Sequence, residues 1–289
     1  MHSNYLKIPV TKTIAPYTAG KEAWLVDIWG VMHNGVLPFA PAVSACKRFR
    51  ASGGTALLLS NAPRPAAGVA AQLDRIGVAR TSFDAIVSSG DAARAFVAAH
   101  APGPIFHLGP ERDLSLYEGL GVRLGPQTSA TAIVCTGLFD DETETPASYT
   151  DLLTACAQLH LPMVCANPDL TVERGGKIIY CAGAVAAAYE TLGGSVTYAG
   201  KPHLPVYMMA LAELARLRGH EVSKQSVLAI GDGIRTDIAG AANAGVQSVY
   251  IASGVHLGPG GALDEAVLAD LFPAGTPQPA AAMMGLAWE

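Results

Sequence analysis

The stretch WLVDIWGV, residues 24–31, decides the fold class of this chain. Its apolar run ends in a carboxylate at Asp27, and Gly30 follows three residues later. Short runs that are apolar throughout are typical of parallel strands buried on both faces. In open α/β sheets the ligand crevice lies beyond the carboxyl ends of the strands. We therefore expect Asp27 at the mouth of a site, where Gly30 lets the backbone turn and brings N–H groups towards an anion. The alternative is an aspartate that only caps a helix or a turn.

Similar apolar runs recur along the chain and alternate with helical patterns such as LPVYMMALAELARLRG, residues 204–219. This alternation predicts an α/β protein with a doubly wound, Rossmann-like parallel sheet. The predicted strands are residues 23–27, 55–60, 104–109, 131–137, 162–167, 195–200, 226–231 and 247–254.

The loop-rich middle of the chain interrupts this pattern and reads as a second α/β unit inserted into the first. We predict a core of residues 1–102 and 183–289, and an inserted cap domain of residues 103–182 that includes the hairpin-like TVERGGKIIYC, residues 171–181. Such insertions are tolerated where the entry and exit points can lie close together at a loop. The Pro- and Ala-rich tail, residues 273–289, is expected to lie over the surface.

Composition limits the partners. Apolar residues make up 50% of the 289 residues, charged residues 15%, and the formal net charge is -5 without long runs of one sign. Such a surface does not attract nucleic acid or anionic lipid, so we expect a small-molecule substrate. The first residues lack the apolar core of a signal peptide, and no run of about 18 apolar residues could span a bilayer. We therefore expect a cytoplasmic protein with no nucleic-acid or membrane partner, and a homodimer is left open.

Polar residues also follow two other predicted strands. Ser60 and Asn61 end one run, and a hydroxyl with the free N–H groups of the next turn can hold a phosphate. Either residue could equally cap a helix. Lys201 lies just past the run at 195–200 and is a candidate counter-ion for phosphate or for an anionic nucleophile. A solvated surface lysine is the alternative.

A fourth run, VLAIG at residues 227–231, leads into Asp232 and, five residues later, Asp237. Hard oxygen ligands gathered at one point suit Mg²⁺, which takes only one or two carboxylates and keeps several waters. The alternative for Asp237 is an N-cap of the helix that follows.

Strand-Asp, strand-Ser, Lys and strand-Gly-Asp-x4-Asp occur in this order in the haloacid-dehalogenase superfamily. The chain resembles its phosphatase branch with a large α/β cap between the second and third motifs, class IIA, to which the nitrophenylphosphatases belong. Asn167-Pro168-Asp169 is similar to the N-P-D of that group's cap. Gly183-Ala184, with Glu190, is similar to the segment that returns to the core. The resemblance covers residues 23–254.

The resemblance implies a role for each motif. Asp27 would attack phosphorus and form an aspartyl-phosphate, with Lys201 as the second catalytic residue. Mg²⁺ would be held by Asp27, the carbonyl oxygen of Trp29 and Asp232, with Asp237 placed to hold metal-bound water. The residues expected to bind phosphate and substrate are Gly30, Ser60, Asn61, Arg64, Asn167 and Asp169.

The chain departs from the family at Trp29. The phosphatase pattern is Asp-x-Asp, in which the second Asp protonates the leaving group and then activates water. Trp29 can do neither, and such general acid–base assistance is typically worth 10²–10⁴-fold. His33 is the nearest alternative acid in the sequence, although a lone histidine is more often structural.

Three hypotheses follow from these residues. The first is a Mg²⁺-dependent phosphatase of a small phosphorylated metabolite that acts through the aspartyl-phosphate on Asp27. The second is cleavage of another bond, such as carbon–phosphorus, whose leaving group needs no acid. The third is a phosphate-binding regulatory protein that has kept the fold without turnover. The identity of the substrate is not predicted, because cap loops vary freely on a fixed scaffold.

Overall fold

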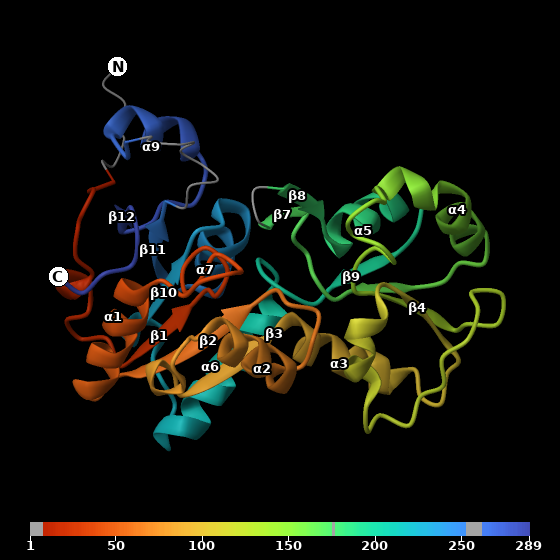
Figure 1. The fold of residues 1–289 in the computed structure, drawn as a ribbon, viewed down its shortest axis with the longest axis horizontal. Coiled ribbons are helices and arrows are strands. Elements are labelled where there is room, and N and C mark those ends of the chain that lie inside the picture. Colours follow the sequence, from red (N-terminus) through yellow and green to blue (C-terminus); the bar gives the residue numbers. More distant parts are fainter. Residues whose placement is uncertain (1–7, 175–176, 253–261) are drawn as a thin grey trace. The chain divides into compact units, whose positions relative to one another are not determined.

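The computed structural model describes residues 8–174, 177–252 and 262–289. Its contacts divide the chain into a first unit, residues 1–59, 73–86 and 207–289, and a second unit, residues 60–72 and 87–206. The strands (Figure 1) are β1 (Ala23–Val26), β2 (Thr55–Ser60), β3 (Ala85–Ser88), β4 (Ile105–Leu108), β5 (Ala132–Cys135), β6 (Met163–Cys165), β7 (Thr171–Arg174), β8 (Lys177–Tyr180), β9 (Val196–Tyr198), β10 (Val227–Gly231), β11 (Gln247–Ile251) and β12 (Ala281–Met283). The helices are α1 (Ala40–Ala51), α2 (Ala66–Ile76), α3 (Ser89–Ala99), α4 (Thr150–Gln158), α5 (Ala182–Thr191), α6 (Leu204–Arg218), α7 (Ala239–Ala244) and α9 (Glu265–Leu271). Within the described ranges, every helix is too short or too polar to cross a membrane.

The first unit is built on a six-stranded sheet in the order β12-β11-β10-β1-β2-β3. β1 lies between β10 and β2 and pairs with both in parallel, with Ala23 opposite Val227 and Thr55. Its four residues are all buried, as expected for a strand covered on both faces. Trp24 stacks on Phe49 of α1, with 4.1 Å between the ring centroids. The predicted α/β fold with a parallel central sheet is therefore confirmed.

Two strands of this sheet were not predicted. β3 has the short sequence AIVS, and β12 lies in the tail that was expected to drape over the surface. β12 instead pairs in parallel with β11, and its three residues are buried. That expectation was wrong because a short alanine-rich run carries no local β signal, and pairing with a distant strand decides its conformation.

The second unit contains a four-stranded sheet in the order β4-β5-β6-β9, and all its neighbours pair in parallel. Side chains alternate between two hydrophobic clusters, as the two-residue period of a strand requires. On β5, Ile133 and Cys135 belong to one cluster, and Val134 belongs to the other. Residues of α4 and α5 cover the first face, and residues of α3 cover the second. Helices therefore pack on both faces of this sheet as well.

The second unit extends beyond the predicted cap segment. Its hairpin of β7 and β8 agrees with the pattern at 171–181, and Thr171 pairs with Tyr180 in antiparallel fashion. However, α5 begins at Ala182 and crosses the predicted boundary, and β9, which lies beyond it, still pairs with β6. The domain boundaries at 102/103 and 182/183 stay a prediction.

Candidate metal and phosphate sites

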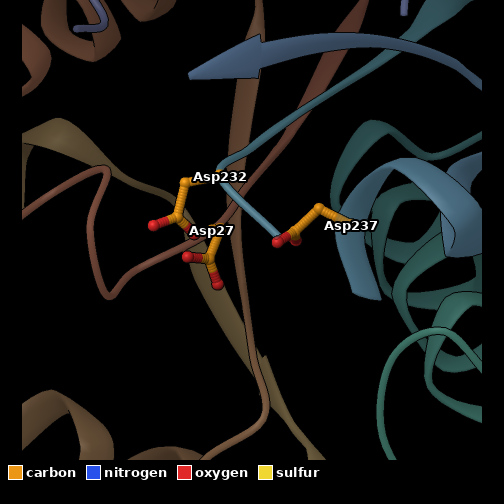
Figure 2. Close-up of side chains that lie close together, drawn as sticks. All are labelled: Asp27, Asp232 and Asp237. Carbon is orange, nitrogen blue, oxygen red and sulfur yellow. The ribbon is translucent and has the colours of Figure 1, made fainter. Parts of the chain in front are cut away.

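Three carboxylates gather at the carboxyl edge of the first unit's sheet. Asp27 directly follows β1, Asp232 directly follows β10, and Asp237 lies in a π-helical turn over Ile234–Ile238. One ligand oxygen from each lies within 4.8 Å of the others, and Figure 2 shows the three side chains converging. Asp27 and Asp237 are only 7% and 6% exposed. Buried like charges this close need a compensating positive charge, and carboxylate oxygens are ligands that Mg²⁺ prefers, so this donor set fits a divalent cation.

The turn after β1 requires glycine at position 30. Gly30 has a φ of +83°, and a Cβ built on it would lie 2.1 Å from Oδ2 of Asp232. The missing side chain therefore makes room for a carboxylate of the acidic group. The N–H of Gly30 donates to the carbonyl oxygen of His33. The predicted sharp turn is present, but this N–H is already used within the turn rather than turned towards an anion.

Asp237 does not cap the helix that follows it. α7 begins at Ala239, and its N-cap residue, Ile238, makes no side-chain capping bond. The Asp237 carboxylate instead accepts a hydrogen bond of 3.0 Å from the N–H of Gly233, four residues earlier. This bond orients the carboxylate within the turn that follows β10.

Trp29 packs against the loop that follows it. Its indole meets the ring of His33 edge to face, with centroids 5.2 Å apart. A Cβ on Gly35, whose φ is +89°, would lie 2.6 Å from Cη2 of Trp29. Glycine at position 35 therefore leaves room for the indole of Trp29, and the ring of His33 packs against it.

His33 is poorly suited to be the missing acid. It is 1% exposed, and its Nδ1 accepts a hydrogen bond from the N–H of Gly35. Burial lowers the pKa of His33 to about 4, so the ring is neutral at neutral pH. A neutral imidazole is a weak proton donor, and this favours a structural role for His33.

The predicted phosphate-binding residues lie mainly in the second unit. Ser60 is the last residue of β2, and its Oγ accepts from the N–H of Ala62. α2 begins only at Ala66, so neither Ser60 nor Asn61 is its N-cap. Lys201 is 2% exposed, which excludes a solvated surface lysine.

The N-P-D loop of the second unit folds back on itself. The side-chain oxygen of Asn167 accepts from the N–H of Asp169. Asp169 in turn accepts from the side-chain amide of Asn61 at 2.9 Å. The structure therefore brings Asn61, Asn167 and Asp169 together with Lys201 in one unit, while Asp27, Trp29, Gly30, Asp232 and Asp237 share the other.

Arg64 contacts a residue that sequence reasoning missed. Its Nε lies 3.6 Å from Oδ1 of Asp113, and its guanidinium also donates to Gln72. Asp113 is 1% exposed, although it lies in the charged stretch ERDLSLY that looks like a solvated turn. No local signal distinguishes this aspartate from its neighbours. A role for Arg64 towards phosphate stays a prediction.

The buried carboxyl of Asp113 should make the stability of the folded protein depend on pH. Burial raises the pKa of this carboxyl above its ordinary value of 3.8, and Arg64 opposes the shift. Between the ordinary pKa, about 4, and the raised pKa, the folded state binds more protons than the unfolded state. The free energy of unfolding that Asp113 contributes therefore falls as pH rises between these two pKa values. We expect Asp113→Asn to become more stable relative to wild type on going from about pH 4.5 to about pH 7.5, measured by urea unfolding. A difference that moves the other way would mean that Arg64 holds the carboxylate ionised.

Comparisons with known proteins agree with this fold and acidic group. Residues 24–123 match the family model described as haloacid dehalogenase-like hydrolase, and residues 198–268 match one described as HAD-hydrolase-like. A solved haloacid dehalogenase-like hydrolase from Brucella suis is 42% identical, with a TM-score of 0.86 over 96% of this chain and 100% of that chain. The chain belongs to the haloacid dehalogenase-like hydrolase family.

Two further relatives come from Mycobacterium tuberculosis. A D-glycerol 3-phosphate phosphatase is 28% identical over 248 residues, which are 81% of this chain and 64% of that protein. The chain thus spans less than two thirds of this curated relative's length. A glycerol phosphate phosphatase solved in complex with magnesium has a TM-score of 0.69 and 24% identity, covering 96% of this chain and 78% of that one. At that identity the likeness concerns the fold alone.

Proposed function

We propose that this protein is a Mg²⁺-dependent phosphatase of a small phosphorylated metabolite, with Asp27 as its nucleophile. The observation that carries the proposal is the convergence of Asp27, Asp232 and Asp237 at the carboxyl ends of parallel strands. The D-glycerol 3-phosphate phosphatase of M. tuberculosis, 28% identical over 248 residues, supports the substrate class. The cytoplasm remains the expected location.

The reaction would begin at the carboxylate of Asp27, whose main chain is held in the sheet. The N–H of Asp27 donates to the carbonyl oxygen of Ile230, so the main chain of the nucleophile stays in the sheet ladder. A carboxylate oxygen of Asp27 forms a bond to phosphorus as the bond to the leaving oxygen breaks. Water then cleaves the aspartyl-phosphate, releasing inorganic phosphate and restoring Asp27.

The remaining residues would position the phosphoryl group and neutralise its negative charge. These two effects are most of what phosphoryl transfer requires. Mg²⁺, when bound by Asp27, Asp232 and the carbonyl oxygen of Trp29, would supply positive charge to the phosphoryl oxygens. Asp237 would orient water at the metal. Ser60, the N–H of Asn61 and the ammonium of Lys201 would hold the phosphoryl group.

One observation favours a second candidate, a phosphate-binding protein without turnover. Position 29 holds an indole, and His33 is buried and neutral, so neither provides an acid. A substrate with a good leaving group would need no acid, and such a substrate separates the two functions.

The test is a screen of phosphate esters with Mg²⁺ and with excess chelator. The panel should hold an aryl phosphate, an acyl phosphate, glycerol 3-phosphate and a phosphonate, with release of inorganic phosphate as the readout. We expect Mg²⁺-dependent hydrolysis of the aryl and acyl phosphates. Binding of inorganic phosphate without turnover of any of them would favour the second candidate, and release of phosphate from the phosphonate alone would favour carbon–phosphorus cleavage.

A further inference from the structure

The side-chain amide of Asn61 joins three parts of the second unit. Its Oδ1 accepts from the main-chain N–H of Lys201 at 2.7 Å, and its Nδ2 donates to the carbonyl oxygen of Lys201 at 3.2 Å. The same Nδ2 donates to Oδ1 of Asp169 at 2.9 Å. One amide thus contacts both main-chain groups of Lys201 and the carboxylate of the N-P-D loop.

These bonds are made in a buried place. Asn61 is 5% exposed and Lys201 is 2% exposed. Both hydrogens of the Nδ2 group and one lone pair of Oδ1 are used, so the amide has a single orientation that satisfies its partners. Buried polar groups that lose a partner are costly, so the arrangement resists displacement of Lys201.

The neighbouring backbone is packed closely on the amide. A Cβ built on Gly200 would lie 2.4 Å from Oδ1 of Asn61 and 2.7 Å from Oγ of Ser89. It would also lie 2.8 Å from Cδ of Pro168, in the N-P-D loop. Glycine at position 200 therefore lets the main chain before Lys201 approach both Asn61 and this loop.

We infer that the Asn61 side chain is a positioning residue, which holds Lys201 in place for phosphate and couples it to Asp169. The inference rests on the proposed function in so far as Lys201 is taken to bind phosphate. From the sequence, Asn61 and Asp169 were expected only to bind phosphate and substrate. The side chains of these two residues bind each other, so a change in the conformation of the N-P-D loop would alter the position of Lys201.

The test exchanges the donor and the acceptor of one hydrogen bond. Asn61→Asp keeps an acceptor for the N–H of Lys201, loses both amide donors and places a second carboxylate beside Asp169. Misplacement of a binding group by about 1 Å can cost 10²-fold, so we expect kcat to fall by about 100-fold. We expect affinity for inorganic phosphate, measured by calorimetry, to fall about tenfold, a change of about 1.4 kcal/mol.

The double variant Asn61→Asp with Asp169→Asn restores the bond with reversed polarity, because the amide at 169 can now donate to the carboxylate at 61. We expect it to recover at least about tenfold of the lost kcat and most of the phosphate affinity, the signature of direct coupling in a double-mutant cycle. Asp151→Asn, an exposed position on α4, is the matched control for an Asp→Asn change. Thermal unfolding of each variant separates a loss of position from a loss of fold.

Each outcome decides the inference. Asn61→Asp within about threefold of wild type, or a double variant no better than the single one, would overturn it. If Asn61→Asp alone does not fold, the folding and phosphate affinity of the double variant decide, and loss of either counts against the inference. If the wild type hydrolyses no ester yet the phosphate affinities follow the expected pattern, the inference holds and the proposed function fails.

Discussion

Asp27→Asn is expected to abolish hydrolysis, with a fall in kcat on the order of 10⁴-fold or more, as seen when other covalent nucleophiles are removed. The amide is nearly the same size as the carboxylate, so the packing around this buried position is kept. It carries no negative charge and is a poor nucleophile towards phosphorus. The measurement is the steady-state rate with an aryl phosphate and saturating Mg²⁺.

The variant should also lose the covalent intermediate. Wild-type protein quenched in acid during turnover should carry phosphate on the peptide that contains Asp27, detectable by mass spectrometry, and the variant should not. Asp151→Asn, exposed on α4, controls for the change of charge. Substantial residual hydrolysis by Asp27→Asn, or phosphate on a different peptide, would remove Asp27 from its role.

Hydrolysis by the wild-type protein is expected to depend steeply on the leaving group, because position 29 provides no acid. Negative charge then builds up on the departing oxygen, and a weakly basic oxygen bears it best. Aryl and acyl phosphates should turn over about 10²–10⁴-fold faster than alkyl phosphates, since this is the usual contribution of general acid–base assistance. Rates for a series of aryl and alkyl phosphates of graded leaving-group pKa provide the measurement.

Trp29→Asp should narrow that difference by accelerating the alkyl phosphates most. Trp29→Asn is the matched control, because it removes the same indole and introduces a side chain of the same size that cannot donate a proton as an acid. Both variants lose the contact of the indole with His33 and Gly35, so any loss of stability should be similar in the two. Equal rates for the two variants, or equal wild-type rates for aryl and alkyl phosphates, would show that another group supplies the proton.

Local sequence signals were sufficient to predict most strands of the two parallel sheets. β1, β2, β10 and β11 fall within the predicted runs, because short buried parallel strands are apolar throughout. β3 and β12 were missed, since their short runs become strands only by pairing with segments far away in the chain. The position of β9 beside β6 has the same non-local origin.

The candidate metal site could be predicted because its residues follow a general rule of parallel sheets. Asp27 and Asp232 directly follow adjacent strands, and parallel strands bring their carboxyl ends to one edge. The partners of these residues could not be predicted. Gly30 leaves room for the carboxylate of Asp232, and Asp113 is buried against Arg64. Both arrangements depend on contacts between segments with no common sequence pattern.

By itself, therefore, the sequence determined the α/β class, the parallel strands and the acids at their ends, because burial and strand direction act residue by residue along the chain. Only the tertiary structure decided what surrounds those residues. It packed the indole of Trp29 on Gly35, buried His33 as a neutral ring, and bound the Asn61 amide to Lys201 and Asp169. These contacts join residues up to 140 positions apart, and such pairings depend on how the folded chain packs rather than on any local preference.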